Sequence, residues 1–127
     1  MKDKRPVFLP VNPFKFPLPF VAFASILHRI SGIALLFAVG YFLYLLQLAL
    51  SSPAGFEQAH NALAQPIHQL AMFVSLAALA YHFILGVKHL LLDFHLFDTT
   101  KGSQLATTIS FCLFAILLIL IAVWIWT

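Results

Sequence analysis

The chain has 127 residues, of which 62% are hydrophobic and only 9% are charged. A soluble domain is roughly 45–50% apolar, so this composition excludes a soluble globular protein and indicates an integral membrane protein. A chain of this length is expected to form one membrane domain, residues 1–127. The net charge of +3 does not indicate nucleic-acid binding, because the basic residues gather on one side of the predicted membrane segments.

The chain opens with a proline-rich arm, residues 1–23, which contains "MKDKRPVFLPVNPFKFPLPF". Proline removes a backbone donor and breaks helices, so the arm is expected to lie along the membrane surface or against a partner. It lacks the compact apolar run and the cleavage site of a signal peptide. The first membrane span is therefore expected to stay in place as an uncleaved anchor.

Three apolar runs follow the arm, near residues 24–49, 66–93 and 105–126. Each run is long enough to cross a bilayer core of about 30 Å, which takes roughly 20 helical residues. A helix satisfies its own backbone groups in lipid, so the sequence predicts an all-α membrane protein with three transmembrane helices. Because the chain is so short, we expect cofactors or partner subunits to supply any further function, with the three helices as part of a heteromeric helical bundle.

The connections between the spans are short. Pro53 and Gly55 in "SSPAGFEQAH" mark a turn after the first span, and Pro66 can open the second helix, where its missing N–H has no intrahelical partner anyway. The polar stretch "FDTTKGSQ" joins the second and third spans. Neither connection has room for a second domain.

The basic residues indicate the orientation in the membrane. The side shared by the N-terminus and the second connection holds all seven: Lys2, Lys4, Arg5, Lys15, Arg29, Lys88 and Lys101. Positive charge concentrates on the cytoplasmic side of membrane proteins, which predicts a cytoplasmic N-terminus and a C-terminus outside. We expect a multi-pass protein of the bacterial cytoplasmic (inner) membrane rather than of the mitochondrial inner membrane.

Histidine is the residue type that carries chemistry here. Four of the six histidines fall within or at the ends of the predicted spans, namely His28, His68, His82 and His89. Ionisable groups inside a membrane are costly and are by default candidates for function. His82 and His89 are nearly two helical turns apart and share one face, with Gly86 between them. We expect His28 and Arg29 of the first span to meet this face near the cytoplasmic boundary.

These groups suit a b-type haem. Haem iron takes neutral imidazole as an axial ligand, the flat macrocycle needs a small residue where it approaches a helix, and its propionates need cations. His82 is the predicted iron ligand, and Gly86 leaves room for the ring. His28, Arg29 and His89 are the predicted propionate partners. A histidine that only hydrogen-bonds a neighbouring helix is the structural alternative.

Ser25 and Arg29 suggest a second ligand. They lie four residues apart on one helix face and offer a hydroxyl and a charged fork to a carbonyl oxygen, such as that of a quinone head group. Spacing alone equally allows a serine bonded to its own helix and an arginine that extends to the membrane interface.

Three stretches resemble one family, the cytochrome b556 subunit of succinate dehydrogenase (respiratory complex II). They are "RPV" at residues 5–7, "SILHRISG" at 25–32 and "HFILGVKHLLLD" at 82–93, and the likeness covers nearly the whole chain. The resemblance implies that His82 is a haem b axial ligand and that His28, Arg29 and His89 lie near the propionates. It places Ser25 with Arg29 in the pocket for ubiquinone or a related quinone.

The resemblance also implies the partners. A flavoprotein subunit would oxidise succinate, an iron–sulfur subunit would pass electrons to quinone, and a second small membrane anchor would share the haem. This chain has no dinucleotide fingerprint and one cysteine, Cys112, so we expect a non-catalytic anchor subunit of an enzyme. Three positions depart from the usual family pattern: Lys88 replaces an arginine, and Leu92 and His95 replace commoner residues.

Two other functions fit part of the pattern. His68 and His82 are fourteen residues apart, about 21 Å along a helix, which would suit an electron carrier with two haems. A purely structural anchor with no cofactor is the other alternative. For His60, His68 and His95 we favour structural roles.

Overall fold

A computed structural model describes residues 19–127, and in this range the chain is almost entirely helical. The helices are α1 (Phe20–Ser51), α2 (Pro53–Leu63), α3 (Pro66–Asp93) and α4 (Thr100–Trp126). Three of them, α1, α3 and α4, are long and apolar enough to cross a membrane. The prediction of an all-α membrane protein with three spans is confirmed. Most of the predicted proline-rich arm, residues 1–18, lies outside the described residues.

Two of the spans begin earlier than hydropathy alone indicates. Helix α1 begins at Phe20, directly after Pro19. Helix α4 begins at Thr100, where Thr99 Oγ1 accepts a hydrogen bond from the Gly102 N–H at 3.0 Å. A cap of this kind satisfies one of the free N–H groups of the first turn, so the helix extends beyond the apolar run into polar sequence.

The first connection contains a helix of its own, α2, where the sequence suggests only a turn. Ser52 Oγ accepts a hydrogen bond from the Gly55 N–H at 2.9 Å, and Pro53 occupies the first turn, where proline is favoured. A Cβ on Gly55 would collide with the Leu48 carbonyl oxygen, so glycine allows α2 to lie close against the end of α1. Pro53 and Gly55 thus begin a helix here.

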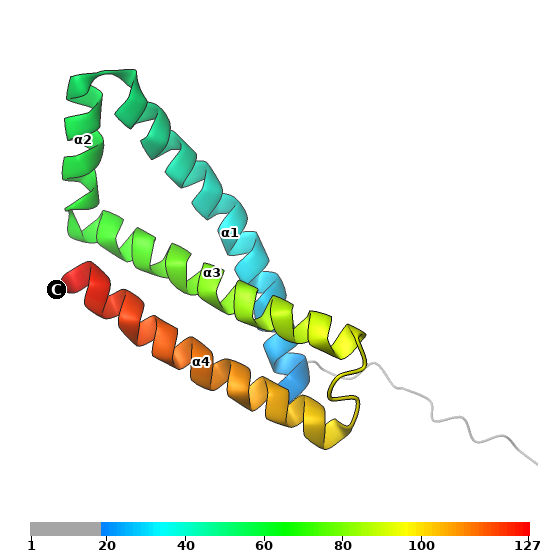
Figure 1. Ribbon diagram of the computed structural model, residues 1–127. Helices are drawn as coiled ribbons and strands as arrows, with labels where there is room; N and C mark the ends of the chain where they lie inside the picture. Colours follow the sequence, from blue (N-terminus) through cyan, green and yellow to red (C-terminus); the bar gives the residue numbers. More distant parts are fainter. Residues whose placement is uncertain (1–18) are drawn as a thin grey trace, which may run out of the picture.

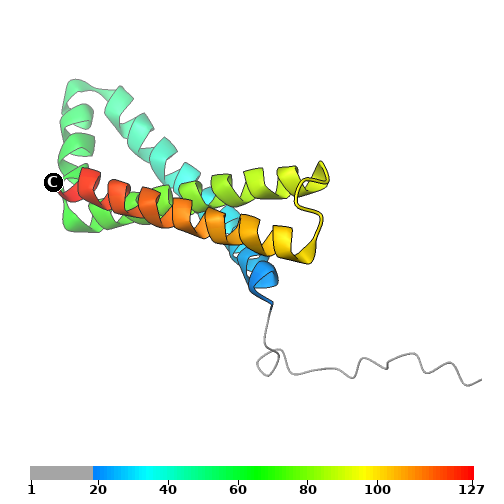
Figure 2. The same ribbon diagram turned by 60° about the horizontal axis from the view of Figure 1, so that its bottom comes forward.

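The three long helices are arranged as an antiparallel pair crossed by a third helix. Helices α3 and α4 run side by side in opposite directions, while α1 crosses α3 and then diverges from it toward α2 (Figure 1, Figure 2). The start of α1 and the connection between α3 and α4 lie toward one end of the bundle. Helix α2 and the C-terminus lie at the other end, as expected for three successive spans.

A small core holds α1, α3 and α4 together near this crossing. Ala24, Tyr81 and Leu85 are buried, and Phe111 and Phe114 of α4 pack against them. The Tyr81 hydroxyl donates a hydrogen bond to the Ala24 carbonyl oxygen at 2.9 Å. Because Tyr81 immediately precedes His82, this bond helps to fix the rotation of α3 that points His82 toward α1. Most large apolar side chains outside the core are exposed, as expected for a surface that contacts membrane or other subunits.

Candidate functional site

Three imidazole rings meet where α1 crosses α3. The His28 ring of α1 stacks on His82 of α3, with ring centroids 4.1 Å apart and planes 12° from parallel. It also stacks on His89, with centroids 5.1 Å apart and an interplanar angle of 22°. We call His28, His82 and His89 the histidine cluster. The sequence prediction that His28 meets the His82–His89 face is confirmed.

Each of the first two histidines bonds the backbone of the other. His28 Nε2 lies 3.1 Å from the His82 carbonyl oxygen, and His82 Nδ1 lies 3.1 Å from the His28 carbonyl oxygen. A carbonyl oxygen can only accept, so both ring nitrogens must carry a proton and donate. The two helices are therefore joined at their crossing by a reciprocal pair of polar contacts in an otherwise apolar setting.

Ser31 extends this network and shows which ring nitrogen of neutral His82 carries the proton. The Ser31 hydroxyl is buried, donates to the His28 carbonyl oxygen at 2.6 Å, and places its oxygen 3.0 Å from His82 Nδ1. Its single proton is used on the carbonyl, so the serine oxygen accepts from His82 Nδ1–H. Both contacts of Nδ1 assign neutral His82 to the Nδ1–H tautomer. Its Nε2 nitrogen then carries an unshared electron pair, the form in which imidazole binds a metal.

Two glycines border the cluster with different amounts of space. A Cβ added to Gly32 would lie 3.0 Å from His82 Cε1, a tighter contact than a Cβ usually makes, so the His82 ring would have to move by a few tenths of an ångström. A Cβ on Gly86 would lie 3.5 Å from His28 Nε2, an ordinary contact. The role of Gly86 beside a macrocycle therefore stays a prediction, whereas the missing side chain of Gly32 lets the His82 ring lie close to α1.

The remaining residues predicted for the site surround the cluster less tightly. His89 Nδ1 donates to the Leu85 carbonyl oxygen of its own helix at 2.7 Å, which leaves Nε2 unprotonated in the neutral ring. Arg29 is exposed and forms no hydrogen bond with the cluster within residues 19–127. Ser25 is half-buried one turn earlier on α1. The structure thus places Ser25 and Arg29 on one helix face but does not join Arg29 to the three imidazoles.

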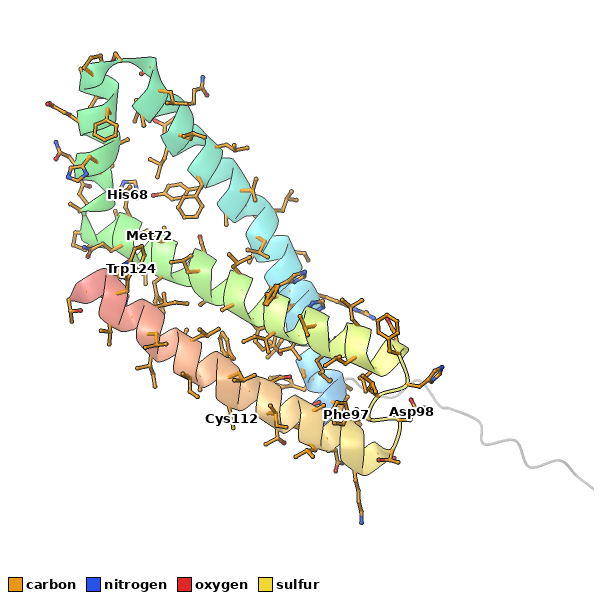
Figure 3. The ribbon with its side chains drawn as sticks, in the orientation of Figure 1. His68, Met72, Phe97, Asp98, Cys112 and Trp124 are labelled. Atoms are coloured by element: carbon orange, nitrogen blue, oxygen red, sulfur yellow. The ribbon has the colours of Figure 1, made fainter. Side chains whose placement is uncertain are left out.

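The other histidines have local partners elsewhere. His68 hydrogen-bonds the Tyr41 hydroxyl through Nδ1 near the α2 end of α3, far from the connection that contains Phe97 and Asp98 (Figure 3). His60 lies on α2 and stacks on Phe56, with ring centroids 6.5 Å apart. His95 Nδ1 lies 3.2 Å from Asp98 Oδ2.

Sequence reasoning missed Ser31 and Gly32 as members of the site. Both lie within the quoted stretch "SILHRISG", so the signal was their position one turn after His28. Their roles depend on where α1 crosses α3, which the sequence of α1 alone does not fix. Among residues 19–127 no three His, Cys, Asp or Glu side chains are arranged so that they could hold one metal ion together, but a haem iron requires only one imidazole from a given chain.

Two comparisons with known proteins bear on this arrangement. Residues 1–123 match the family model described as succinate dehydrogenase/fumarate reductase transmembrane subunit. The chain is also 33% identical over 130 residues to the succinate dehydrogenase cytochrome b556 subunit of Coxiella burnetii (strain RSA 493 / Nine Mile phase I). That alignment covers 99% of this chain and 100% of the relative.

Proposed function

The chain belongs to the succinate dehydrogenase/fumarate reductase transmembrane subunit family, and we propose that it binds haem b with a second anchor subunit and forms part of a quinone site. Family membership makes it a membrane subunit of an enzyme complex. The observation that supports a haem site is the state of His82. Its Nδ1–H is held by Ser31 and the His28 carbonyl oxygen, and its Nε2 is left with a free electron pair.

The donor chemistry of the site fits one axial ligand. A ligating histidine usually donates its other ring N–H to an acceptor, which fixes the ring and raises its basicity. Ser31 and the His28 carbonyl oxygen are such acceptors for His82. When bound, the haem would supply one-electron transfer. The protein's part is to hold His82 in one tautomer and to surround it with apolar helices.

The second axial ligand is proposed to come from a different polypeptide. The His28 ring lies almost flat against the His82 ring at 4.1 Å, so no macrocycle fits between the two rings. His89 is on the same face of α3 as His82 and cannot reach the far side of a haem. His68 is about 21 Å away by helix rise and is bonded to Tyr41. A second small membrane anchor with its own histidine would complete the site.

The propionates are proposed to face the end of the bundle where α3 ends. His89 lies four residues before the last residue of α3 and is half-buried, with Nε2 free of hydrogen bonds inside the described chain. His28 and Arg29 lie at the same crossing on α1. These three residues supply the protonatable and cationic groups that two carboxylates need near a polar boundary.

The quinone site is proposed to use Ser25 and Arg29. They are one helical turn apart near the start of α1, where the hydroxyl and the guanidinium can both donate to a carbonyl oxygen. Arg29 is exposed, so it can reach a molecule or subunit that docks against this end of α1. Electrons from an iron–sulfur subunit would be delivered here, while a flavoprotein subunit would oxidise succinate. This chain would act as a non-catalytic anchor.

The experiment is an absorption and EPR spectrum of the assembled complex carrying His82→Ala. We expect loss of the low-spin signal of a haem with two histidine ligands. His68→Ala is the matched control, because it removes a membrane histidine at the other end of α3, and it should leave that signal unchanged. One haem per complex is expected in the wild type. Two haems would favour the electron carrier with two haems, and an unchanged spectrum in His82→Ala would reject the proposal.

A further inference from the structure

Lys88 is a buried cation on a different side of α3 from the histidine cluster. It is 3% exposed and forms no hydrogen bond or ion pair with any residue of the described range 19–127. Lys88 lies about 100° from His89 around the helix, on the side toward α4. Burial of an ammonium group without a counter-charge is costly. Within residues 19–127 no side-chain nitrogen is both fully buried and without a partner, so the Lys88 ammonium group opens onto its surroundings, and an anion from outside the described chain can reach it and stabilise its charge.

Lys88 lines a groove of about 270 Å³ between α3 and α4. Apolar side chains form most of the walls, among them Phe83, Val87 and Leu91 of α3 and Ile109 and Leu113 of α4. Ser110 also lines the groove, but its hydroxyl already donates to the Ala106 carbonyl oxygen at 2.8 Å. Among the residues described as lining the groove, Lys88 alone carries a charge, so one anionic group in an apolar molecule matches it.

The groove lies near the end of the bundle where α3 meets the α3–α4 connection. Lys88 is five residues before the last residue of α3, about 7.5 Å along the helix axis. Phe97, from the connection, also lines the groove. In a helix that crosses a membrane, a position this close to the helix end lies near the level where phospholipid headgroups give way to acyl chains. A lysine side chain can extend along an apolar surface to reach that level. Phe83, Val87, Ile109 and Leu113 are exposed and offer an apolar surface for the chains.

We propose that Lys88 binds the phosphate of an anionic phospholipid whose glycerol and upper acyl chains occupy the α3–α4 groove. A free anion such as inorganic phosphate would have to leave water for apolar walls, which is unfavourable. A lipid already resides in the membrane, and it offers a phosphate to pair with the Lys88 ammonium group and acyl chains to contact the apolar walls of the groove. Basic pockets between membrane helices are a known means of recognising acidic headgroups. The site does not involve the histidine cluster and stands apart from the proposed haem and quinone functions.

The test uses the purified complex with its partner subunits, in detergent and stripped of lipid. Phosphatidylglycerol or phosphatidylcholine is added, and bound lipid is counted by native mass spectrometry while the thermal transition is followed. We expect phosphatidylglycerol to bind and raise the transition temperature more than phosphatidylcholine does. Lys88→Met should weaken phosphatidylglycerol binding by about fivefold, the size expected for one basic group at a membrane surface.

Three further variants distinguish the contribution of the Lys88 charge to lipid binding from the contribution of the groove. Lys88→Arg keeps the positive charge and should retain phosphatidylglycerol binding. Lys101→Met removes a charge from an exposed position at the same end of the bundle and should leave phosphatidylglycerol binding unchanged. Ala106→Leu adds bulk to the α4 wall of the groove and leaves the Lys88 charge in place, and it should weaken phosphatidylglycerol binding as Lys88→Met does. This variant decides the question if Lys88→Met fails to assemble.

Three results would overturn the proposal, and each would indicate a different alternative. Equal binding of phosphatidylglycerol by wild type and Ala106→Leu would exclude the groove as the lipid site. Equal stabilisation of the wild type by inorganic phosphate would show that a free anion binds. Release of a partner subunit from Lys88→Met, with phosphatidylglycerol binding retained, would show that the counter-charge is a carboxylate of that partner.

Discussion

The Ser31 hydroxyl donates a hydrogen bond to the His28 carbonyl oxygen at 2.6 Å, while its oxygen lies 3.0 Å from His82 Nδ1. One buried side chain on α1 therefore links the backbone of its own helix to a ring on α3. Because of this contact, the position of the proton on His82 depends on how α1 packs against α3. It makes Ser31 a positioning residue for the proposed ligand.

We predict that Ser31→Ala raises the midpoint potential of the haem while leaving the haem bound. Loss of an acceptor from Nδ1–H makes the imidazole a weaker donor to iron and disfavours the oxidised state. A hydrogen bond contributes about 1 kcal/mol, which corresponds to a shift on the order of 40 mV for one electron. A redox titration followed by absorbance measures it. Ser31→Thr keeps the hydroxyl and should restore the wild-type value, and an unchanged potential in Ser31→Ala would remove Ser31 from this role.

A second prediction concerns the close approach of Gly32 to the His82 ring. Gly32→Ala would place a Cβ 3.0 Å from His82 Cε1, so the ring or α1 must shift. We expect a reduced haem content in the purified complex, measured by extraction and absorbance. Gly40→Ala is the matched control on the same helix, because a Cβ there meets nothing within 4 Å. Equal haem content in both variants would contradict the structural argument.

The histidine cluster shows what helical periodicity predicts and what it does not. The spacing of His82 and His89 predicted one face of α3, because both residues lie on a single regular helix. The pairing of that face with His28 followed from the predicted membrane depth of two spans. Ser31 and Gly32 were missed because their roles depend on the rotation of α1 at its crossing with α3. Tertiary packing around Tyr81 and Ala24 helps to set that rotation.

Helix α2 was missed for a different reason. Its sequence "PAGFEQAHNAL" is only weakly apolar, so a search for membrane spans treats it as a connection. The local signal was nonetheless present: Ser52 before Pro53 is a typical helix start. The proposed haem, quinone and partner subunits would belong to the assembled complex, and the sequence of one chain indicates them only through residue chemistry and family resemblance.

Electron delivery to quinone provides the third prediction. Ser25→Ala or Arg29→Leu should lower quinone reduction by the complex while succinate oxidation with a soluble dye acceptor stays largely intact. The physical reason is the loss of a donor to the quinone oxygen on the exposed start of α1. Lys101→Leu, a charge removed at the same end of the bundle, should affect neither activity. Equal loss of both activities would indicate failed assembly, and full quinone reduction would exclude the two residues from the site.

The orientation of the chain can be tested with fusions to a reporter that is active only outside the cytoplasm. The reporter should be active after Phe56 or after Thr127, and inactive after Gly102. The reason is that all seven Lys and Arg residues lie away from the first connection. The opposite pattern would place the proposed haem and quinone residues on the wrong side of the membrane for electrons that arrive from cytoplasmic subunits.

The last prediction is that this chain cannot form a haem with two histidine ligands by itself. The His28 and His82 rings are nearly parallel and 4.1 Å apart, so they cannot lie on opposite faces of one macrocycle without separation of α1 from α3. That separation would break the contacts of His82 Nδ1 with Ser31 and with the His28 carbonyl oxygen. Expressed alone in membranes with haem supplied, the chain should therefore lack the low-spin EPR and absorption signals of such a haem. Co-expression with the second anchor subunit should produce them. A normal low-spin spectrum from the chain alone would mean that both ligands come from this polypeptide, and the shared site would have to be abandoned.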